Sequence, residues 1–166
     1  MTAQPQPGDE APDFSLPTGA AQPLRLSALK GTKVALYFYP TDDTETCTAE
    51  AIAFNGLRAE FARAQTEIIG ISPDSLASHD KFKRKHKLAL TLASDEARAA
   101  IEAYGVWQEK TLFGRKYMGV ERTTVLIDSA GAIARIWRKV RTPGHAEQVL
   151  EATEALTMQP AGSAKR

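Results

Sequence analysis

The chain has 166 residues, a formal net charge of +1 and one cysteine, and these numbers exclude several classes of protein. Because 21 lysines and arginines face 20 aspartates and glutamates, the overall charge gives no sign of a nucleic-acid or anionic-membrane partner. A single cysteine cannot form an intramolecular disulfide or a multi-cysteine zinc site, and no run of 18 apolar residues is present to span a membrane.

The beginning of the chain lacks the basic and apolar segments of a signal peptide. We therefore expect a cytoplasmic globular protein without nucleic-acid or membrane partners. A chain of this length buries roughly two thirds of its unfolded surface, and no interior linker interrupts its pattern. We predict one domain over residues 1–166.

The first part of the chain predicts an extended lead, a buried strand and a helix. Five of the nine prolines lie within the first 23 residues, where segments 13–16 and 23–26 predict a short hairpin. The continuous apolar run 34–39 ends before Pro40 and is typical of a central strand that is covered on both faces. Apolar residues at spacings of three and four then predict an amphipathic helix over residues 46–64.

The rest of the chain continues this alternation and closes with a hairpin and a helix. The sequence next predicts a strand over 67–71 and a helix that Asp74 or Ser75 caps and that reaches about Lys85. A strand around 90–92 and a helix that Ser94 caps and Gly105 ends follow. Beyond these lie a hairpin of 123–127 and 132–137 around the turn 128–131, a helix from Thr142-Pro143 through Leu156, and a flexible tail over about 158–166. This order predicts an α/β sheet with a parallel start and an antiparallel end, and the thioredoxin-like architecture is one of several that fit.

Cys47 follows the first buried strand and stands at the start of the first predicted helix. A free cysteine in a globular protein is often a small buried hydrophobe, and that is one interpretation. The residues from Asp42 to Thr48 are polar, however, which argues against an apolar pocket. A position in the first helical turn also faces unpaired backbone N–H groups, which favour a thiolate. The local sequence therefore favours a reactive thiol.

A helix terminus alone does not make such a thiol reactive. An ordinary thiol, with a pKa of about 8.5, is only slightly ionised at pH 7, and making it mostly thiolate takes about 2.7 kcal/mol. The helix terminus supplies about 0.3–1 kcal/mol, and the nearby Asp42, Asp43 and Glu45 oppose ionisation. Because no basic residue lies between Pro40 and Gly56, a cation from a distant part of the chain is required.

The segment from Pro40 to Cys47 contains the motif Pro-x-x-x-Thr-x-x-Cys, and with it the chain resembles the peroxiredoxins. The branch that it resembles is peroxiredoxin Q, also called bacterioferritin comigratory protein. Further similar stretches follow in the same order along nearly the whole chain: residues 8–14, 70–74, 104–107 and 122–128. The resemblance implies a thioredoxin-like fold, in which helices flank a mixed central sheet and an N-terminal hairpin extends it. It also implies reduction of hydroperoxides without a metal or a bound cofactor.

The resemblance assigns roles to five residues. Cys47 matches the peroxidatic cysteine, which attacks the O–O bond and becomes a sulfenic acid. Thr44 matches the residue that orients the peroxide oxygen and contacts the thiolate, and Pro40 matches the one that shields the pocket from water. Arg122 matches the arginine that holds both thiolate and substrate, so it would supply the distant cation. Glu50 matches a polar residue that orients this arginine, with a solvated helix carboxylate as the alternative.

Two departures from the branch concern the mechanism. Glu45-Thr46 stands where the branch usually has Pro-Gly, which leaves the reactivity of Cys47 open. Ile52 stands where many members carry a resolving cysteine. We therefore expect a one-cysteine mechanism, in which an external thiol (thioredoxin, glutaredoxin or glutathione) or Cys47 of another subunit resolves the sulfenic acid. We expect a monomer, with a dimer as the alternative.

The remaining polar and aromatic features have less specific interpretations. The spacings of His79, His86 and His145 match no metal signature, and we expect surface histidines. The basic cluster over 81–87 is expected to be a solvated helix end, with a phosphate or redox-partner patch as the alternative. Three aromatic residues flank what is expected to be a loop and could border a site for an apolar hydroperoxide or simply pack: Trp107, Phe113 and Tyr117.

Two functions compete with peroxide reduction at this stage. Cys47 could belong to a redox sensor or binding module that oxidises and signals without turnover. It could also form a cysteine hydrolase with one of the histidines. Both alternatives use the same thiol, so its surroundings in the fold distinguish them.

Overall fold

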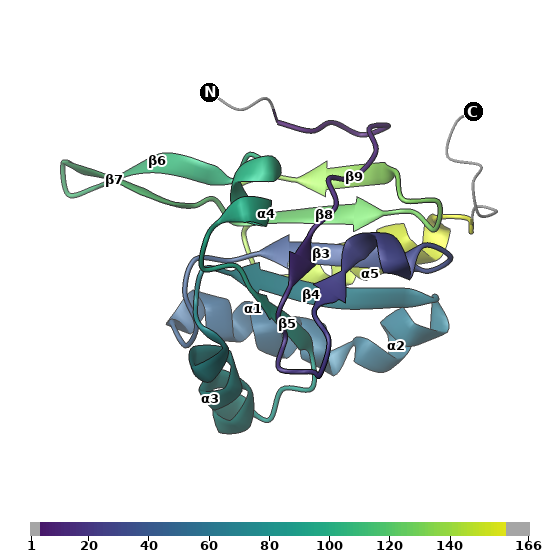
Figure 1. Ribbon diagram of the computed structural model, residues 1–166, viewed down its shortest axis with the longest axis horizontal. Helices are drawn as coiled ribbons and strands as arrows, with labels where there is room; N and C mark the ends of the chain where they lie inside the picture. Colours follow the sequence, from purple (N-terminus) through teal and green to yellow (C-terminus); the bar gives the residue numbers. More distant parts are fainter. Residues whose placement is uncertain (1–3, 159–166) are drawn as a thin grey trace.

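The computed structural model describes residues 4–158, and a five-stranded mixed sheet forms its centre (Figure 1). The order across this sheet is β5-β4-β3-β8-β9, in which β3, β4 and β5 are parallel and β8 and β9 are antiparallel. The strands are β3 (Lys33–Phe38), β4 (Thr66–Ser72), β5 (Thr91–Ser94), β8 (Thr123–Ile127) and β9 (Ile133–Trp137). The predicted parallel start and antiparallel end are confirmed.

The central strand β3 supplies both halves of the hydrophobic core. Its side chains alternate between the two faces of the sheet, as the pleat of a strand requires. Val34, Leu36 and Phe38 belong to one buried cluster, and Ala35 and Tyr37 belong to the other. The continuous apolar pattern of the sequence therefore reflects a strand that is buried on both faces.

Different elements cover the two faces. On the face of Phe38, the hairpin of β1 (Ser15–Leu16) and β2 (Leu24–Arg25), the 3₁₀ helix η1 (Leu26–Leu29) and helix α4 (Ala99–Ala103) contribute to the core. On the face of Tyr37, the cover consists of α1 (Glu45–Gly56), α2 (Arg58–Arg63), α3 (Leu76–His86) and α5 (His145–Ala155). The predicted N-terminal hairpin and flanking helices are confirmed, and Cys47 belongs to the second face.

The helix predicted over residues 46–64 is two helices. The chain breaks between α1 and α2 at Leu57, whose backbone N–H bonds to the carbonyl of Phe54 in a tighter turn. Gly56 precedes the break and has a low intrinsic helix propensity. Phe54 before the break and Phe61 after it both lie in the core, with ring centroids 6.0 Å apart.

Helix starts were predicted with mixed success. Ser75 caps α3 as expected, since its side chain accepts a hydrogen bond from the backbone N–H of Ser78. The prediction that Ser94 caps the next helix was wrong, because Ser94 ends β5 and the Asp95 carboxylate receives the N–H groups at the start of α4. The last helix does not begin at Thr142-Pro143 but at His145, after a left-handed Gly144.

The segment expected to be a loop before residue 122 is a β-hairpin. Strands β6 (Trp107–Leu112) and β7 (Arg115–Val120) pair with each other and project away from the central sheet (Figure 1). Phe113 and Gly114, both with positive φ, form its two-residue turn. A bulky residue rarely adopts this conformation, so the dipeptide gives little sign of a hairpin in the sequence.

The described residues bear on two further expectations. No helix among residues 4–158 is long and apolar enough to cross a membrane. The tail expected from about residue 158 falls almost wholly outside the described residues.

Gly70 in β4 gives a test of this packing. A Cβ at this position would lie 2.8 Å from Leu92 Cδ2 and 2.8 Å from Tyr37 Cζ, so we expect Gly70→Ala to destabilise the fold by about 1–3 kcal/mol. Gly56→Ala is the matched control, because a Cβ there has no neighbour within 4 Å. Urea denaturation of both variants measures the difference, and equal midpoints would contradict the packing.

Candidate active site

The N-terminus of α1 holds Cys47 in its first turn. Thr44 is the N-cap residue, and its hydroxyl oxygen accepts a hydrogen bond from the backbone N–H of Cys47 at 3.3 Å. The Thr44 carbonyl accepts the N–H of Thr48 at 2.8 Å, which closes the first turn of the helix. Thr44 and Cys47 therefore lie side by side.

The Cys47 side chain is buried, with 2% of its surface exposed. It belongs to the cluster that contains Tyr37, Tyr39 and Phe54. The expectation that Cys47 lies in no apolar pocket, drawn from its sequence neighbours, was therefore wrong in part: residues 43–46 are exposed, whereas the Cys47 side chain packs among aromatic residues.

Arg122 brings the distant cation to this sulfur. It lies between β7 and β8, next to the central strand, and its Nη2 donates a hydrogen bond to Cys47 Sγ at 3.3 Å. Its Nη1 donates to Glu50 Oε1 at 2.6 Å. The planar guanidinium serves both partners at once, which a lysine ammonium cannot do with the same fixed geometry.

Glu50 is the carboxylate behind Arg122, and its side chain is 2% exposed. The alternative of a solvated helix carboxylate was therefore wrong. Burial raises the pKa of Glu50 to about 7, although the neighbouring Arg122 opposes this shift. Its second oxygen, Oε2, is buried without a hydrogen-bond partner among the described residues. The arginine and the carboxylate fix each other in the interior.

The other two positions singled out by the resemblance lie close by in the chain. Pro40 lies two residues beyond the end of β3 and is partly buried, at the beginning of the loop that leads to Thr44. Ile52 lies on α1 with half of its side chain exposed to solvent. The structure thus brings four of the five predicted residues into one hydrogen-bonded group, and Pro40 lies in the loop that leads to Thr44.

Comparison with known proteins agrees with this geometry. Residues 7–136 match the model of the AhpC/TSA family. A Coxiella burnetii protein assigned as a peroxiredoxin Bcp is 47% identical over 86% of this chain and 95% of its own, and peroxiredoxin Bcp of Bacillus subtilis is 43% identical over 87% and 92%. The chain belongs to the AhpC/TSA family, among the Bcp peroxiredoxins.

A solved structure extends the comparison to three dimensions. The bacterioferritin comigratory protein of Xanthomonas campestris, a structure described in terms of its alkyl peroxide reduction activity, superimposes with a TM-score of 0.85 at 36% identity. The match covers 95% of this peroxiredoxin and 98% of that chain. The thioredoxin-like architecture is thereby confirmed.

Two of the three histidines of this peroxiredoxin are buried, contrary to expectation, whereas His86 pairs with Asp43 at the surface as expected. His79 and His145 are both 3% exposed. Each histidine hydrogen-bonds to a group other than Cys47: His79 to Asp42, His86 to Asp43, and His145 to the hydroxyl of Thr124. Burial, with a further contribution from Arg122, lowers the pKa of His145 to about 4. Within residues 4–158 no histidine pairs with the thiol, so the hydrolase alternative has no base.

A buried network around Asp42 fixes the loop between Pro40 and Thr44. Asp42 accepts hydrogen bonds from the hydroxyls of Tyr39 and Ser78, at 2.6 and 2.7 Å, and lies 2.7 Å from His79 Nδ1. Its backbone N–H donates to Asp74 Oδ2 at 2.8 Å. Sequence reasoning missed this network, because residues 37 positions apart meet only after α3 has packed against the loop.

Both ring nitrogens of His79 face acceptors, Asp42 Oδ2 on one side and the Ala93 carbonyl on the other. The ring therefore bridges the loop that carries Asp42 and the strand β5 that carries Ala93. Asp74 Oδ2 accepts hydrogen bonds from the backbone N–H of Asp42 and from the hydroxyl of Ser72. Asp42 Oδ2 accepts one from the hydroxyl of Ser78. The cluster therefore anchors the loop that carries the cap of Cys47.

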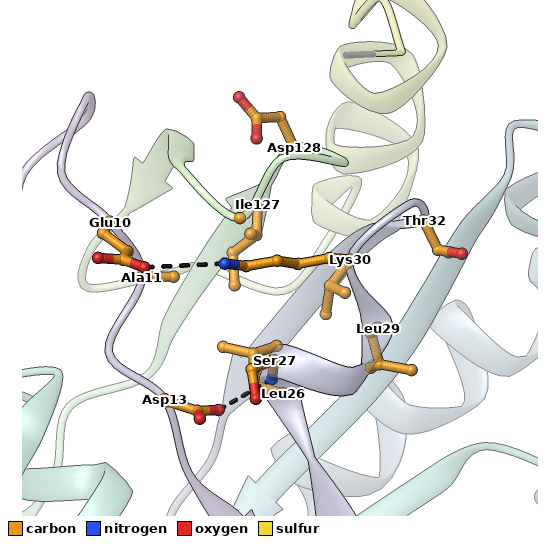
Figure 2. A pocket seen from close by; sticks show the side chains of 12 residues that line it. Glu10, Ala11, Asp13, Leu26, Ser27, Leu29, Lys30, Thr32, Ile127 and Asp128 are labelled. Atoms are coloured by element: carbon orange, nitrogen blue, oxygen red, sulfur yellow. Dashed lines mark hydrogen bonds and ion pairs between the residues drawn. The ribbon is translucent and has the colours of Figure 1, made fainter. Parts of the chain in front are cut away.

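A small cavity lies under the N-terminal segment, on the face of the sheet opposite to Cys47. It has a volume of about 90 Å³, and Leu26, Ile127 and the stem of Lys30 line it, with Lys30 Nζ 3.9 Å from Glu10 Oε2 (Figure 2). Neither Cys47 nor Arg122 contributes to its wall. The cavity therefore adds nothing to the thiol site.

The Asp42 network predicts a loss of stability in Asp42→Asn. Burial raises the pKa of Asp42, but hydrogen bonds from His79, Tyr39 and Ser78 outweigh it and hold the pKa below 3.8. A group with a lowered pKa stabilises the fold above its unfolded value and stops doing so as the pH falls through the folded value. We expect the variant to lose about 2–3 kcal/mol at pH 7.

The difference between wild type and this variant should shrink as the pH falls below about 4, because the unfolded chain then takes up a proton at Asp42 that the folded protein binds only at lower pH. Asp43→Asn is the matched control, because Asp43 is exposed and pairs with Lys85 and His86 at the surface. Urea unfolding at several pH values measures both. A constant difference across this pH range, or an equal loss in the control, would contradict the network.

Proposed function

We propose that this protein reduces hydrogen peroxide and organic hydroperoxides through a Cys47 thiolate. The observation that carries the proposal is the guanidinium of Arg122, which donates to the Cys47 sulfur while the buried Glu50 holds it from behind. A cation in this position stabilises a thiolate and leaves donors directed at the place where a peroxide oxygen would approach. The AhpC/TSA family match supports the same chemistry.

In the first step, the Cys47 thiolate attacks one oxygen of the hydroperoxide. A sulfur–oxygen bond forms as the O–O bond breaks, and the leaving hydroxide or alkoxide takes a proton to become water or an alcohol. The sulfur is oxidised to sulfenic acid and the peroxide is reduced. Thr44, beside the sulfur, would orient the peroxide, and Pro40 would keep water from the loop side of the pocket.

In the second step, an external thiol must return Cys47 to its reduced form, because the chain has no second cysteine. One thiol condenses with the sulfenic acid to a mixed disulfide and releases water, and a second thiol releases Cys47 by exchange. We infer that thioredoxin, glutaredoxin or glutathione supplies these thiols, and that the reducing cytoplasm is the compartment of the cycle.

Because Cys47 is buried, the two steps differ in how easily their reactants reach the sulfur. A peroxide is small enough to reach a sulfur that is 2% exposed, whereas a protein thiol has to meet the sulfur directly. The start of α1 must therefore open before a protein reductant can react, and the anchored loop before Thr44 sets the cost of that opening. A monomer suffices for this cycle.

Cys47→Ser is expected to abolish peroxide consumption, because a serine hydroxyl is a far weaker nucleophile than a thiolate. The assay is multiple turnover of hydrogen peroxide and of an alkyl hydroperoxide with each of the three reductants. In the absence of reductant, wild-type protein should gain one oxygen and then a second by mass spectrometry, as sulfenic and sulfinic acid.

These measurements also test the redox-sensor alternative. A sensor would oxidise once at Cys47 and consume no further peroxide with any reductant. Retained turnover in Cys47→Ser would contradict the proposed mechanism itself.

Arg122→Lys should slow the reaction of Cys47 with peroxide roughly a hundredfold, since one ammonium cannot keep both hydrogen bonds. Stopped-flow kinetics of the oxidation half-reaction measures this rate without any reductant. Arg115→Lys, an exposed change on β7, is the matched control. An unchanged rate in Arg122→Lys would remove the guanidinium geometry from the mechanism.

A further inference from the structure

The charges at the buried site do not balance when Cys47 and Glu50 are both ionised. The thiolate and the carboxylate then share the guanidinium of Arg122, which hydrogen-bonds to both of them. Two negative charges against one positive charge in a water-poor interior are costly unless a further cation contributes. The rest of the site therefore has to supply positive charge or accept a less ionised thiol.

Lys110 of β6 is placed to supply this positive charge. The hairpin of β6 and β7 joins directly to the segment that carries Arg122, and Lys110 and Arg122 line the same cavity, which has a volume of about 330 Å³. Lys110 is partly buried, in contrast to the exposed Lys116 on the partner strand.

The course of the Lys110 side chain follows from the strand opposite. Gly119 of β7 has no side chain, and a Cβ built there would lie 3.4 Å from Lys110 Cδ and 3.7 Å from Lys110 Cε. The lysine stem thus crosses the hairpin over this glycine, and its apolar carbons cover the strand while the ammonium extends beyond it.

We propose that Lys110 is the second cation of the thiol site, and that the field of its ammonium stabilises the Cys47 thiolate beside Arg122. Lys110 does not contact the reacting atoms, so it supports the reaction through Cys47 and is not itself a catalytic residue. This inference rests on the proposed function, because it assigns the electrostatic support of the same thiol.

The electrostatics of Lys110 agree with this placement. Partial burial and the nearby Arg122 lower the pKa of Lys110, while attraction to Cys47 and Glu121 opposes that shift. The field of the ammonium therefore reaches both Arg122 and Cys47.

Other charged and titratable groups surround the site and set the background for a pH measurement. Glu50 of α1 adds negative charge as it ionises near pH 7, and His145 of α5 is neutral there. Burial raises the pKa of Tyr37 on β3 far above its ordinary value, so this phenol stays neutral. Glu121 and Lys139 at the cavity wall carry opposite charges.

The test compares Lys110→Met, which keeps the apolar stem, with Lys110→Arg, which keeps the charge. Lys116→Met is the matched control, because it removes the same charge from an exposed position of the same hairpin. Two rates are measured as a function of pH: alkylation of Cys47 by iodoacetamide and oxidation by hydrogen peroxide. Since Cys47 is the sole cysteine, alkylation reports on one thiol. Circular dichroism verifies the fold of each variant.

We expect Lys110→Met to slow both reactions roughly threefold to tenfold at pH 7 and to move the midpoint of the alkylation profile to higher pH. Lys110→Arg should stay near wild type, and Lys116→Met should match it. An unchanged alkylation profile in Lys110→Met, or an equal change in Lys116→Met, would overturn the proposal. If wild type failed to reduce peroxide, the proposed function would fail, and the alkylation profiles would still decide the role of Lys110.

Discussion

The buried ion pair between Arg122 and Glu50 is the interaction on which the site depends. It joins the first helix to the segment before β8, two parts of the chain that lie 72 residues apart. Removing one partner of such a pair would leave an unpaired charge in the interior, at a cost of about 3–5 kcal/mol. The pair therefore holds α1 against the sheet, and with it the Cys47 sulfur at the second arm of the guanidinium.

The sequence carried enough information to predict the sheet and the residues that form the site. The apolar run before Pro40 predicted the central strand because that strand is buried on both faces, and a single cysteine between a strand and a helix marked the site. The free energy needed to ionise the thiol also required a cation from a distant part of the chain. That the cation is Arg122 came from the resemblance to peroxiredoxins, since composition and spacing along the chain do not show which arginine reaches the thiol.

What the sequence could not predict depends on packing between distant segments. The neighbours of Cys47 in the chain are polar, yet the sulfur is buried, because one side of α1 faces solvent while the other packs against Tyr37 and Tyr39. His79 was expected at the surface, but α3 places its ring against the Asp42 carboxylate in the interior. Ser94 resembled a helix cap, but Asp95 supplies the acceptors instead. In each case the partner lies outside the local window from which propensities are judged.

Burial and reactivity of the thiol act against each other in a chain with one cysteine. The same low-polarity surroundings that strengthen the hydrogen bond from Arg122 also penalise the charged sulfur, so the site needs cations more than an exposed thiol would. In the proposed cycle, burial would also keep large thiols from the sulfenic acid until the loop opens, and Asp42 would resist that opening through Tyr39, Ser78 and His79. A longer-lived sulfenic acid meets more peroxide, so in this cycle tight anchoring of the loop would favour over-oxidation of Cys47 when external thiols are scarce.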